Sequence, residues 1–288
     1  ITVPPRQVQA MAPGGGRLQV IMSALAGDGF TVTKLAQLVP TNAGSAEPVI
    51  QSCIIAADAA TGRPLAVVTG NALTLLRTAA ASALASRHLS RPDSASLVLI
   101  GSGALAADMA LAHAALRPLR RIGIWGRSRE RVEGVCRDIQ RRRPDLRAHP
   151  VNDLPAAVAA ADIVTCATSS PRPLLQGDWL QPGSFVDLVG SFSPQTREAD
   201  DTVIRRSRLY VDTRPGALAE AGDLLIPMAA GLITADAIQG DLAELVAGIV
   251  PGRRTPDEIT LFKSVGTAIE DLVATRLLLT LAAAKDGR

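Results

Sequence analysis

The chain has 288 residues, enough for two domains that each bury a core of their own. Its 30 basic and 27 acidic residues nearly balance and aromatic residues make up 2%, so the composition argues against a nucleic-acid-binding protein. The three cysteines Cys53, Cys136 and Cys166 lack the spacing of a metal site, which predicts reduced thiols in a cytoplasmic protein without a bound metal. The sequence contains no run of 18 uncharged apolar residues, so no membrane-spanning segment is predicted.

The first 90 residues have the patterns of several strands followed by one helix. Strands are predicted over Leu18–Ile21, Thr31–Leu38, Val49–Ala57 and Leu65–Val68, the last two as a hairpin, and a helix over Ala72–Leu89. The sequence Arg91-Pro92-Asp93 ends this helix, because proline disfavours helical backbone at the residue before it. We therefore expect a domain boundary at this point.

A dinucleotide-binding fingerprint follows in residues 97–125. The apolar strand pattern Leu97–Ile100 leads into Gly101-Ser102-Gly103, then a helical segment to about Arg117 and a second apolar strand. Gly101 allows a tight turn, Gly103 lets the backbone approach a pyrophosphate, and Ala106 lets the helix pack on the strand. The helix start, including Ala104 and Leu105, then presents N–H groups to the phosphates. The alternative is a glycine-rich loop of an ordinary α/β protein.

The end of the second strand, Ile122–Trp125, indicates which cofactor is bound. A site for NAD usually has an acidic residue there, whereas this chain has Gly126-Arg127-Ser128-Arg129. Guanidinium and hydroxyl groups suit a 2′-phosphate, so we expect NADPH, with NADH possible, and further contacts from Arg131. The alternative for Ser128 is that it caps the next helix.

Strand and helix patterns alternate through the rest of the chain. Helices are predicted over Arg129–Arg142, Ala156–Ala160 and from Ala217 onward, and strands over Ile163–Cys166, Phe185–Val189 and Leu209–Asp212. This alternation predicts an α/β fold with a Rossmann-type doubly wound, mostly parallel sheet, in which ligands bind at the carboxyl ends of the strands. Thr168 lies in such a loop and is a candidate cofactor contact; the alternative is an ordinary turn residue.

Several separated segments, occurring in the same order, make the chain resemble the ornithine cyclodeaminase and mu-crystallin family. They are Val3–Arg6, Thr33–Leu35, Leu76–Ala83, Gly101–Gly103, Leu261–Gly266 and Glu270–Leu272. The resemblance implies a Rossmann domain over residues 91–264. It also implies a smaller β-rich domain, made of residues 1–90 and 265–288, that binds substrate and forms a homodimer, and helices upstream of Ile1.

The resemblance also implies roles for particular side chains. The residue at the Lys34 position contacts the substrate beside the nicotinamide and handles a proton, Arg6 and Arg77 hold the substrate carboxylate, and Arg77 and Thr78 lie near the cofactor. Chemistry agrees, because a guanidinium binds a carboxylate with two hydrogen bonds and the pKa of a lysine changes readily on burial. The alternatives are surface ion pairs for the arginines and a solvated strand residue for Lys34. Further cofactor contacts are expected at Val189, Ser191 and Ser264.

One departure from the family separates its activities. Where ornithine cyclodeaminases carry an aspartate that acts on the substrate amine, this chain has Phe192, which can neither take a proton nor pair with an ammonium. The resemblance then favours hydride transfer to a C=N bond. Δ1-pyrroline-2-carboxylate would be reduced to L-proline, or Δ1-piperideine-2-carboxylate to L-pipecolate, with Lys34 supplying the imine proton and Phe192 an apolar wall. The alternatives are an ornithine cyclodeaminase, an alanine dehydrogenase-like enzyme, or a non-catalytic NADPH-linked binding protein.

Overall fold

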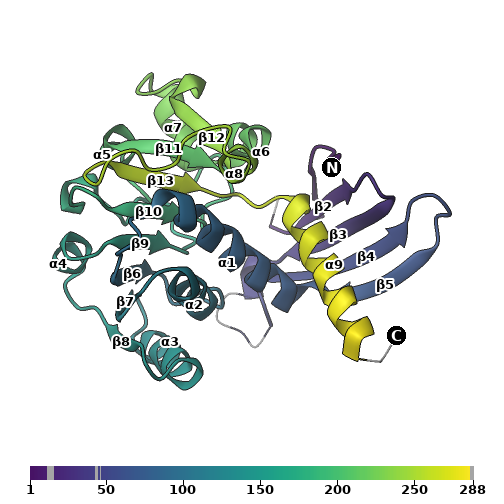
Figure 1. Cartoon of the computed structure of the whole chain (residues 1–288), viewed down its shortest axis with the longest axis horizontal. Helices are drawn as coiled ribbons and strands as arrows, with labels where there is room; N and C mark the ends of the chain where they lie inside the picture. The colour runs from purple at the N-terminus through teal and green to yellow at the C-terminus, as the bar shows by residue number, and fades with distance from the viewer. Residues whose placement is uncertain (12–15, 43–44, 46, 286–288) are drawn as a thin grey trace. The chain divides into compact units, whose positions relative to one another are not determined.

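The computed structural model describes residues 1–11, 16–42, 45 and 47–285, and its internal contacts divide the chain into two units. One unit combines Ile1–Arg77 with Thr267–Arg288, and the other is Thr78–Gly266 (Figure 1). The division lies within helix α1 (Gly70–Leu89), before the domain boundary that the sequence predicts at Arg91–Asp93. The two ends of the chain therefore belong to one folding unit.

The terminal unit is built on a five-stranded antiparallel sheet in the order β1-β2-β3-β4-β5. The strands are β1 (Gln7–Ala10), β2 (Leu18–Leu25), β3 (Phe30–Leu38), β4 (Ile50–Asp58) and β5 (Pro64–Thr69). The four predicted strands are confirmed, with longer bounds for β2 and β5. The short edge strand β1 was not predicted; its four residues are all exposed, although Gln-Val-Gln-Ala alternates polar with apolar side chains.

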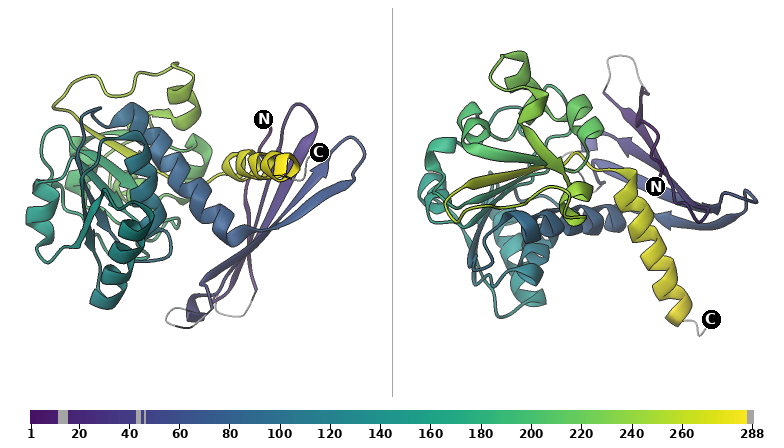
Figure 2. Two further views of the ribbon diagram at one scale, coloured as in Figure 1. Left: turned by 60° about the horizontal axis from the view of Figure 1, so that its bottom comes forward. Right: turned by 45° about the horizontal axis from the view of Figure 1, so that its top comes forward.

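Helix α9 (Ala268–Lys285) packs on one face of this sheet (Figure 2). Its residues Ala268 and Leu272 are buried with Met22, Val32 and Ile54 from the central strands. Side chains alternate between the two faces of a strand, so the residues two positions from Val32 lie on the same covered face. Lys34 is one of them.

The second unit contains a parallel eight-stranded sheet in the order β12-β11-β13-β10-β9-β6-β7-β8. The strands are β6 (Ser96–Ile100), β7 (Arg121–Trp125), β8 (Arg147–Pro150), β9 (Ile163–Cys166), β10 (Phe185–Leu188), β11 (Ser207–Val211), β12 (Ile238–Asp241) and β13 (Ile259–Lys263). The predicted Rossmann-type parallel sheet is confirmed. Strands β8, β12 and β13 were not predicted, and β13 lies inside the sheet between β10 and β11.

Helices cover both faces of the parallel sheet. They are α2 (Ala106–Leu116), α3 (Arg129–Arg142), α4 (Leu154–Ala159), α5 (Asp201–Arg206), α6 (Arg214–Glu220), α7 (Gly222–Ala229) and α8 (Leu242–Val246), with short 3-10 turns at Gly177–Trp179 and Ala235–Ala237. A further 3-10 turn, Pro40–Asn42, follows β3 in the terminal unit. Leu97 and Leu99 of β6 pack with the second half of α1 and with α2, α3 and α8, while Val98 and Ile100 pack with α4 to α7. The sheet is therefore doubly wound, with two buried cores.

A buried polar network crosses the core beneath α2. Asp187 of β10 accepts a hydrogen bond from Ser82 at 3.0 Å through Oδ1. Its Oδ2 atom accepts from Thr165 at 3.0 Å and lies 3.1 Å from His113 Nε2. All four side chains are buried, so the carboxylate satisfies groups on three different elements.

Among the described residues, no helix combines the length and the hydrophobicity that crossing a membrane requires.

Candidate active site

Lys34 is a buried lysine on the covered face of the antiparallel sheet. In register it stands opposite Met22 of β2 and Ile54 of β4, both buried and apolar, and its side chain is only 3% exposed. The Nζ atom donates to Thr74 Oγ1 at 2.7 Å and to Asp271 Oδ1 at 3.1 Å. The alternative of a solvated strand residue is therefore wrong for Lys34.

Asp271 also joins Lys34 to Arg77. Its Oδ1 atom lies 3.3 Å from Arg77 Nε, and Arg77 Nη1 lies 2.5 Å from Glu270 Oε2. Both acidic residues stand in the first turn of α9, where the positive end of the helix dipole favours negative charge. Two cations and two carboxylates thus form one nearly buried, formally neutral group, which we call the Lys34–Asp271 group: Lys34, Arg77, Glu270 and Asp271.

The environment of Lys34 lowers its pKa from 10.5 to about 8. Burial contributes most, because it disfavours the charged form, and the positive charge of Arg77 acts in the same direction. The charge and hydrogen bond of Asp271 oppose this shift. Lys34 is therefore an ammonium at neutral pH that releases its proton far more readily than an ordinary lysine, as a proton donor requires.

Sequence reasoning identified only part of this group. Lys34 and Arg77 lie in one group, and their contacts with a substrate stay a prediction. The sequence indicated no role for Thr74 and Asp271. The signal available for Asp271 was its place in the segment Glu270–Leu272; no local pattern connects it with residue 34. Arg6 immediately precedes β1, whose first residue Gln7 faces Ile21 of β2, and Arg6 itself lies outside the strand.

The glycine fingerprint forms an open turn at the start of α2. Gly101 has φ +137°, and a Cβ there would lie 2.4 Å from the Ala167 carbonyl oxygen, so a side chain is excluded by conformation and by space. Gly103 and Ala104 are exposed, and no atom lies within 4 Å of a Cβ built at Gly103. Leu105 precedes α2 without a side-chain cap. The open space at Gly103 leaves room for the predicted pyrophosphate, and binding of a pyrophosphate at this turn stays a prediction.

The segment after β7 includes Ser128, for which the sequence allows either a cofactor contact or a cap on the next helix. Ser128 Oγ accepts a hydrogen bond from Arg131 N at 3.4 Å and caps α3. Arg129 pairs with Glu133 at 2.9 Å, while Arg127 is exposed. A Cβ at Gly126 would lie 2.6 Å from Ser102 Oγ, so this glycine lets the two loops approach. Contacts of these residues with a cofactor stay a prediction.

The loops after β9 and β10 are tied together by Glu198, a residue that sequence reasoning missed. Its carboxylate accepts from Thr168 N at 2.7 Å and Gly190 N at 2.7 Å, and Val189 and Ser191 flank this glycine. Phe192 follows in the same loop and is 37% exposed. Hydrophobic alternation carries no signal for such a buried acid, so only the fold reveals it.

Ser264 lies at the end of β13 and is buried. Its hydroxyl donates to Asp212 Oδ2 at 3.1 Å, and the same oxygen accepts from Val265 N at 2.8 Å and Gly266 N at 2.6 Å. Asp212 therefore shapes the turn that carries Ser264. This structural role accounts for an acidic residue directly after β11 and assigns it no part in catalysis.

Two alanine substitutions distinguish a glycine needed for the fold from one needed for the ligand. Gly101→Ala should lower the Tm by roughly 5 °C, because of its positive φ and the contact with Ala167. Gly103→Ala should leave the Tm unchanged and weaken NADH binding about tenfold or more, because a methyl group there meets only the ligand. Thermal unfolding and NADH fluorescence titration measure the two effects. Unchanged NADH affinity in Gly103→Ala would contradict a pyrophosphate at this turn.

Comparison with known proteins agrees with both units. The sequence profile of the ornithine cyclodeaminase/mu-crystallin family matches residues 1–286. The chain is 40% identical to a Delta(1)-pyrroline-2-carboxylate reductase of Colwellia psychrerythraea, covering 95% of this chain and 87% of that protein. It is 34% identical to the ketimine reductase mu-crystallin of Mus musculus, covering 96% and 83%.

A solved structure matches the fold across nearly all of the chain. The Delta(1)-pyrroline-2-carboxylate reductase of Thermococcus litoralis, in complex with NADH and L-proline, superposes with a TM-score of 0.94 at 31% identity, covering 99% of this chain and 88% of that one. The profile match and the sequence identities show that the chain belongs to the ornithine cyclodeaminase/mu-crystallin family.

Proposed function

We propose that the protein is a nicotinamide-dependent reductase of cyclic ketimine carboxylates that converts Δ1-pyrroline-2-carboxylate to L-proline and accepts the six-membered homologue. The observation that carries this proposal is the Lys34–Asp271 group, which places a lysine of pKa about 8 beside the guanidinium of Arg77. Relatives that share this fold include pyrroline-2-carboxylate reductases and a ketimine reductase.

In this proposal the protein binds, orients and protonates the substrate. Arg77, together with Arg6, holds the carboxylate, since a guanidinium offers two parallel N–H donors. Lys34 Nζ donates its proton to the imine nitrogen, because an iminium accepts hydride far better than a neutral imine. Reduced nicotinamide, when bound, supplies the hydride that C2 receives. Phe192 supplies an apolar surface for the ring methylenes.

The cofactor preferred by this chain is proposed to be NADPH. The segment Gly126–Arg129 after β7 contains no carboxylate to bind a ribose 2′-hydroxyl, and the exposed guanidinium of Arg127 suits a 2′-phosphate. The relative from Thermococcus litoralis binds NADH, so a comparison of the two cofactors belongs in the first assay.

Reduction of a ketimine tests the proposed activity directly. With Δ1-pyrroline-2-carboxylate as acceptor, we expect rapid oxidation of NADPH followed by absorbance, slower oxidation of NADH, and L-proline as the product. Ornithine with NAD should release no ammonia, because Phe192 cannot bind or deprotonate the substrate amine. Tight NADPH binding without oxidation would exclude this ketimine as substrate, and ammonia release from ornithine would establish cyclodeamination instead.

The pH dependence of turnover should follow Lys34. Because the donor is the ammonium form, kcat/KM, which follows the ionisation of the free enzyme, should fall as pH rises through about 8. Asp271→Asn should move this fall to lower pH, because the Asp271 charge raises the pKa of Lys34. Lys34→Ala should reduce turnover roughly 100-fold or more while sparing NADPH affinity.

Asp28→Asn is the matched control for this pH profile. Asp28 also pairs with a cation on α9, Arg276, at 2.7 Å, but both side chains are exposed. Its profile should coincide with that of the unmodified enzyme. A profile that is the same in Asp271→Asn and Asp28→Asn would contradict control of the Lys34 proton by Asp271.

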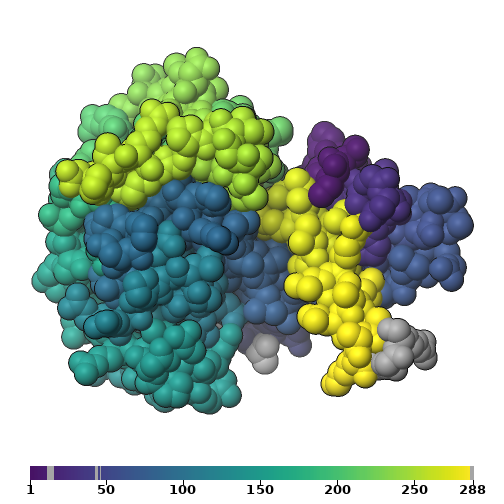
Figure 3. Space-filling view, viewed as in Figure 1, coloured from purple at the N-terminus to yellow at the C-terminus, as the bar shows by residue number. Residues whose placement is uncertain are grey.

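We propose that the protein forms a homodimer through the terminal unit. Val273, Leu277 and Leu281 recur at helical spacing on α9 and are more than half exposed, and α9 lies at the surface in Figure 3. Such an apolar stripe is typical of a protein interface. Leu277→Glu should yield monomers in light scattering, whereas Leu116→Glu, at an exposed position of α2, should not. A monomeric unmodified protein would refute the proposal.

A further inference from the structure

We propose that Glu198 is a positioning residue that holds the loops after β9 and β10 at the spacing needed to bind the nicotinamide cofactor. This inference rests on the proposed function, because it takes Thr168 and Ser191 of these loops as cofactor contacts. Glu198 itself is fully buried, so it acts through the backbone it binds and not by touching the ligand.

The carboxylate of Glu198 connects two neighbouring strand ends. Oε1 accepts from Thr168 N at 2.7 Å in the loop after β9. Oε2 accepts from Gly190 N at 2.7 Å and Ser191 N at 3.3 Å in the loop after β10. Strands β9 and β10 are parallel neighbours, so these loops leave the sheet at the same edge, where ligands bind in doubly wound folds.

The two loops approach each other so closely at Gly190 that no side chain fits between them. A Cβ at Gly190 would lie 2.1 Å from both the nitrogen and the oxygen of Thr168, and 2.5 Å from Glu198 Oε1. The backbones therefore touch at this point. Three N–H donors converge on one acceptor group, and a buried donor without a partner is costly. Any change that removes an acceptor should push the loops apart.

A second charged pair fixes the position of Glu198. Asp223 of α7 accepts from Glu198 N at 2.8 Å and Ala199 N at 3.1 Å. Its other oxygen lies 2.9 Å from Lys263 Nζ, which also donates to the Ser191 carbonyl at 2.6 Å. Lys263 and Asp223 are fully buried. Ser191 is thus held at its N–H by Glu198 and at its carbonyl by Lys263.

The positioning requires the ionised form of Glu198. A carboxylate only accepts hydrogen bonds, whereas protonation turns one oxygen into a donor that faces an N–H group. Burial is the main cause that raises the pKa of Glu198 to about 7, the Lys263 charge lowers it, and Asp223 raises it. The Cys166 thiol of β9, whose own pKa is raised by burial, also faces this group and stays neutral. Protonation below pH 7 should therefore loosen both loops.

The test measures NADH affinity by fluorescence titration without substrate. Glu198→Gln keeps the shape of the side chain but presents an amide NH₂ to one of the loop N–H groups. At pH 8 we expect its NADH Kd to rise about tenfold. In the unmodified protein the Kd should rise several-fold between pH 8 and pH 6, and this dependence should vanish in Glu198→Gln. NADH is the chosen probe because it lacks the titrating 2′-phosphate of NADPH.

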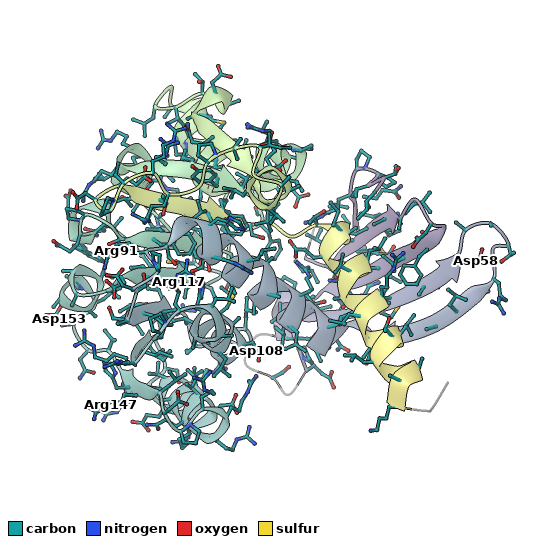
Figure 4. All side chains as sticks on the ribbon, in the orientation of Figure 1. Asp58, Arg91, Asp108, Arg117, Arg147 and Asp153 are labelled. Carbon is teal, nitrogen blue, oxygen red and sulfur yellow. The ribbon has the colours of Figure 1, made fainter. Side chains whose placement is uncertain are left out.

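Asp162→Asn supplies the matched control. Asp162 also uses a carboxylate, here partly buried, to hold backbone N–H groups, accepting from Ala95 N at 2.9 Å and Ser96 N at 3.0 Å. It also pairs with Arg91, labelled in Figure 4. It lies before β9, at the amino end of the strands. Asp162→Asn should lower the Tm but leave the NADH Kd and its pH dependence unchanged.

Each outcome decides the inference. Equal NADH affinity in Glu198→Gln and Asp162→Asn would overturn it, as would a pH dependence that persists in Glu198→Gln. If Glu198→Gln does not fold, a Kd of the unmodified protein that is constant between pH 8 and pH 6 overturns it equally. Because no ketimine is present, a protein that binds NADH as expected but reduces no ketimine would contradict the proposed function and leave this inference standing.

Discussion

The terminal unit depends on the ion pairs that the Asp271 carboxylate forms with Lys34 and Arg77. Lys34 lies on an apolar sheet face between Met22 and Ile54, where an isolated ammonium would lose its proton or prevent packing. Asp271 reaches it from α9 and binds Arg77 with the same oxygen. The last helix of the chain therefore completes the environment of a strand more than 200 residues earlier, and the two ends of the chain must fold together.

The second unit also buries a lysine, Lys263, at the carboxyl end of its sheet. Strand β13 inserts between β10 and β11 and brings Lys263 to the level of the loops after its neighbours. Burying that lysine requires Asp223, and Asp223 in turn fixes the backbone of Glu198. In each unit a buried lysine is paired with an aspartate from a helix, but the consequences differ. The pKa of Lys34 is lowered, whereas the charges of Asp223 and Glu198 outweigh burial and raise the pKa of Lys263.

Local signals predicted the elements that local physics determines. Gly101 marked the turn after β6, and the bounds of α3 follow from the cap at Ser128 and the basic residues of its last turn. Strand β13 was not predicted, because its five residues include the polar Thr260 and Lys263 and form too short an apolar pattern to indicate a buried strand. The roles of Asp271 and Glu198 could not be predicted, since their partners Lys34 and Thr168 lie elsewhere in the sequence. In the sequence alone, a buried acidic residue cannot be told from one exposed to solvent. Their roles depend on strand order, which periodicity does not reveal.

The neutrality of the Lys34–Asp271 group bears on the order of events during catalysis. A ketimine carboxylate with an unprotonated nitrogen adds one negative charge near Arg77. An opposite charge favours the charged form of a neighbouring cation, so substrate binding should raise the pKa of Lys34 and retain its proton. In the proposed reaction, once the imine nitrogen takes that proton, the substrate would carry no net charge and Lys34 would be a neutral amine. Its charged form is then disfavoured again by burial and by Arg77. Asp271 thus holds the proton on Lys34, whereas burial and the charge of Arg77 favour its transfer to the imine in the proposed reaction.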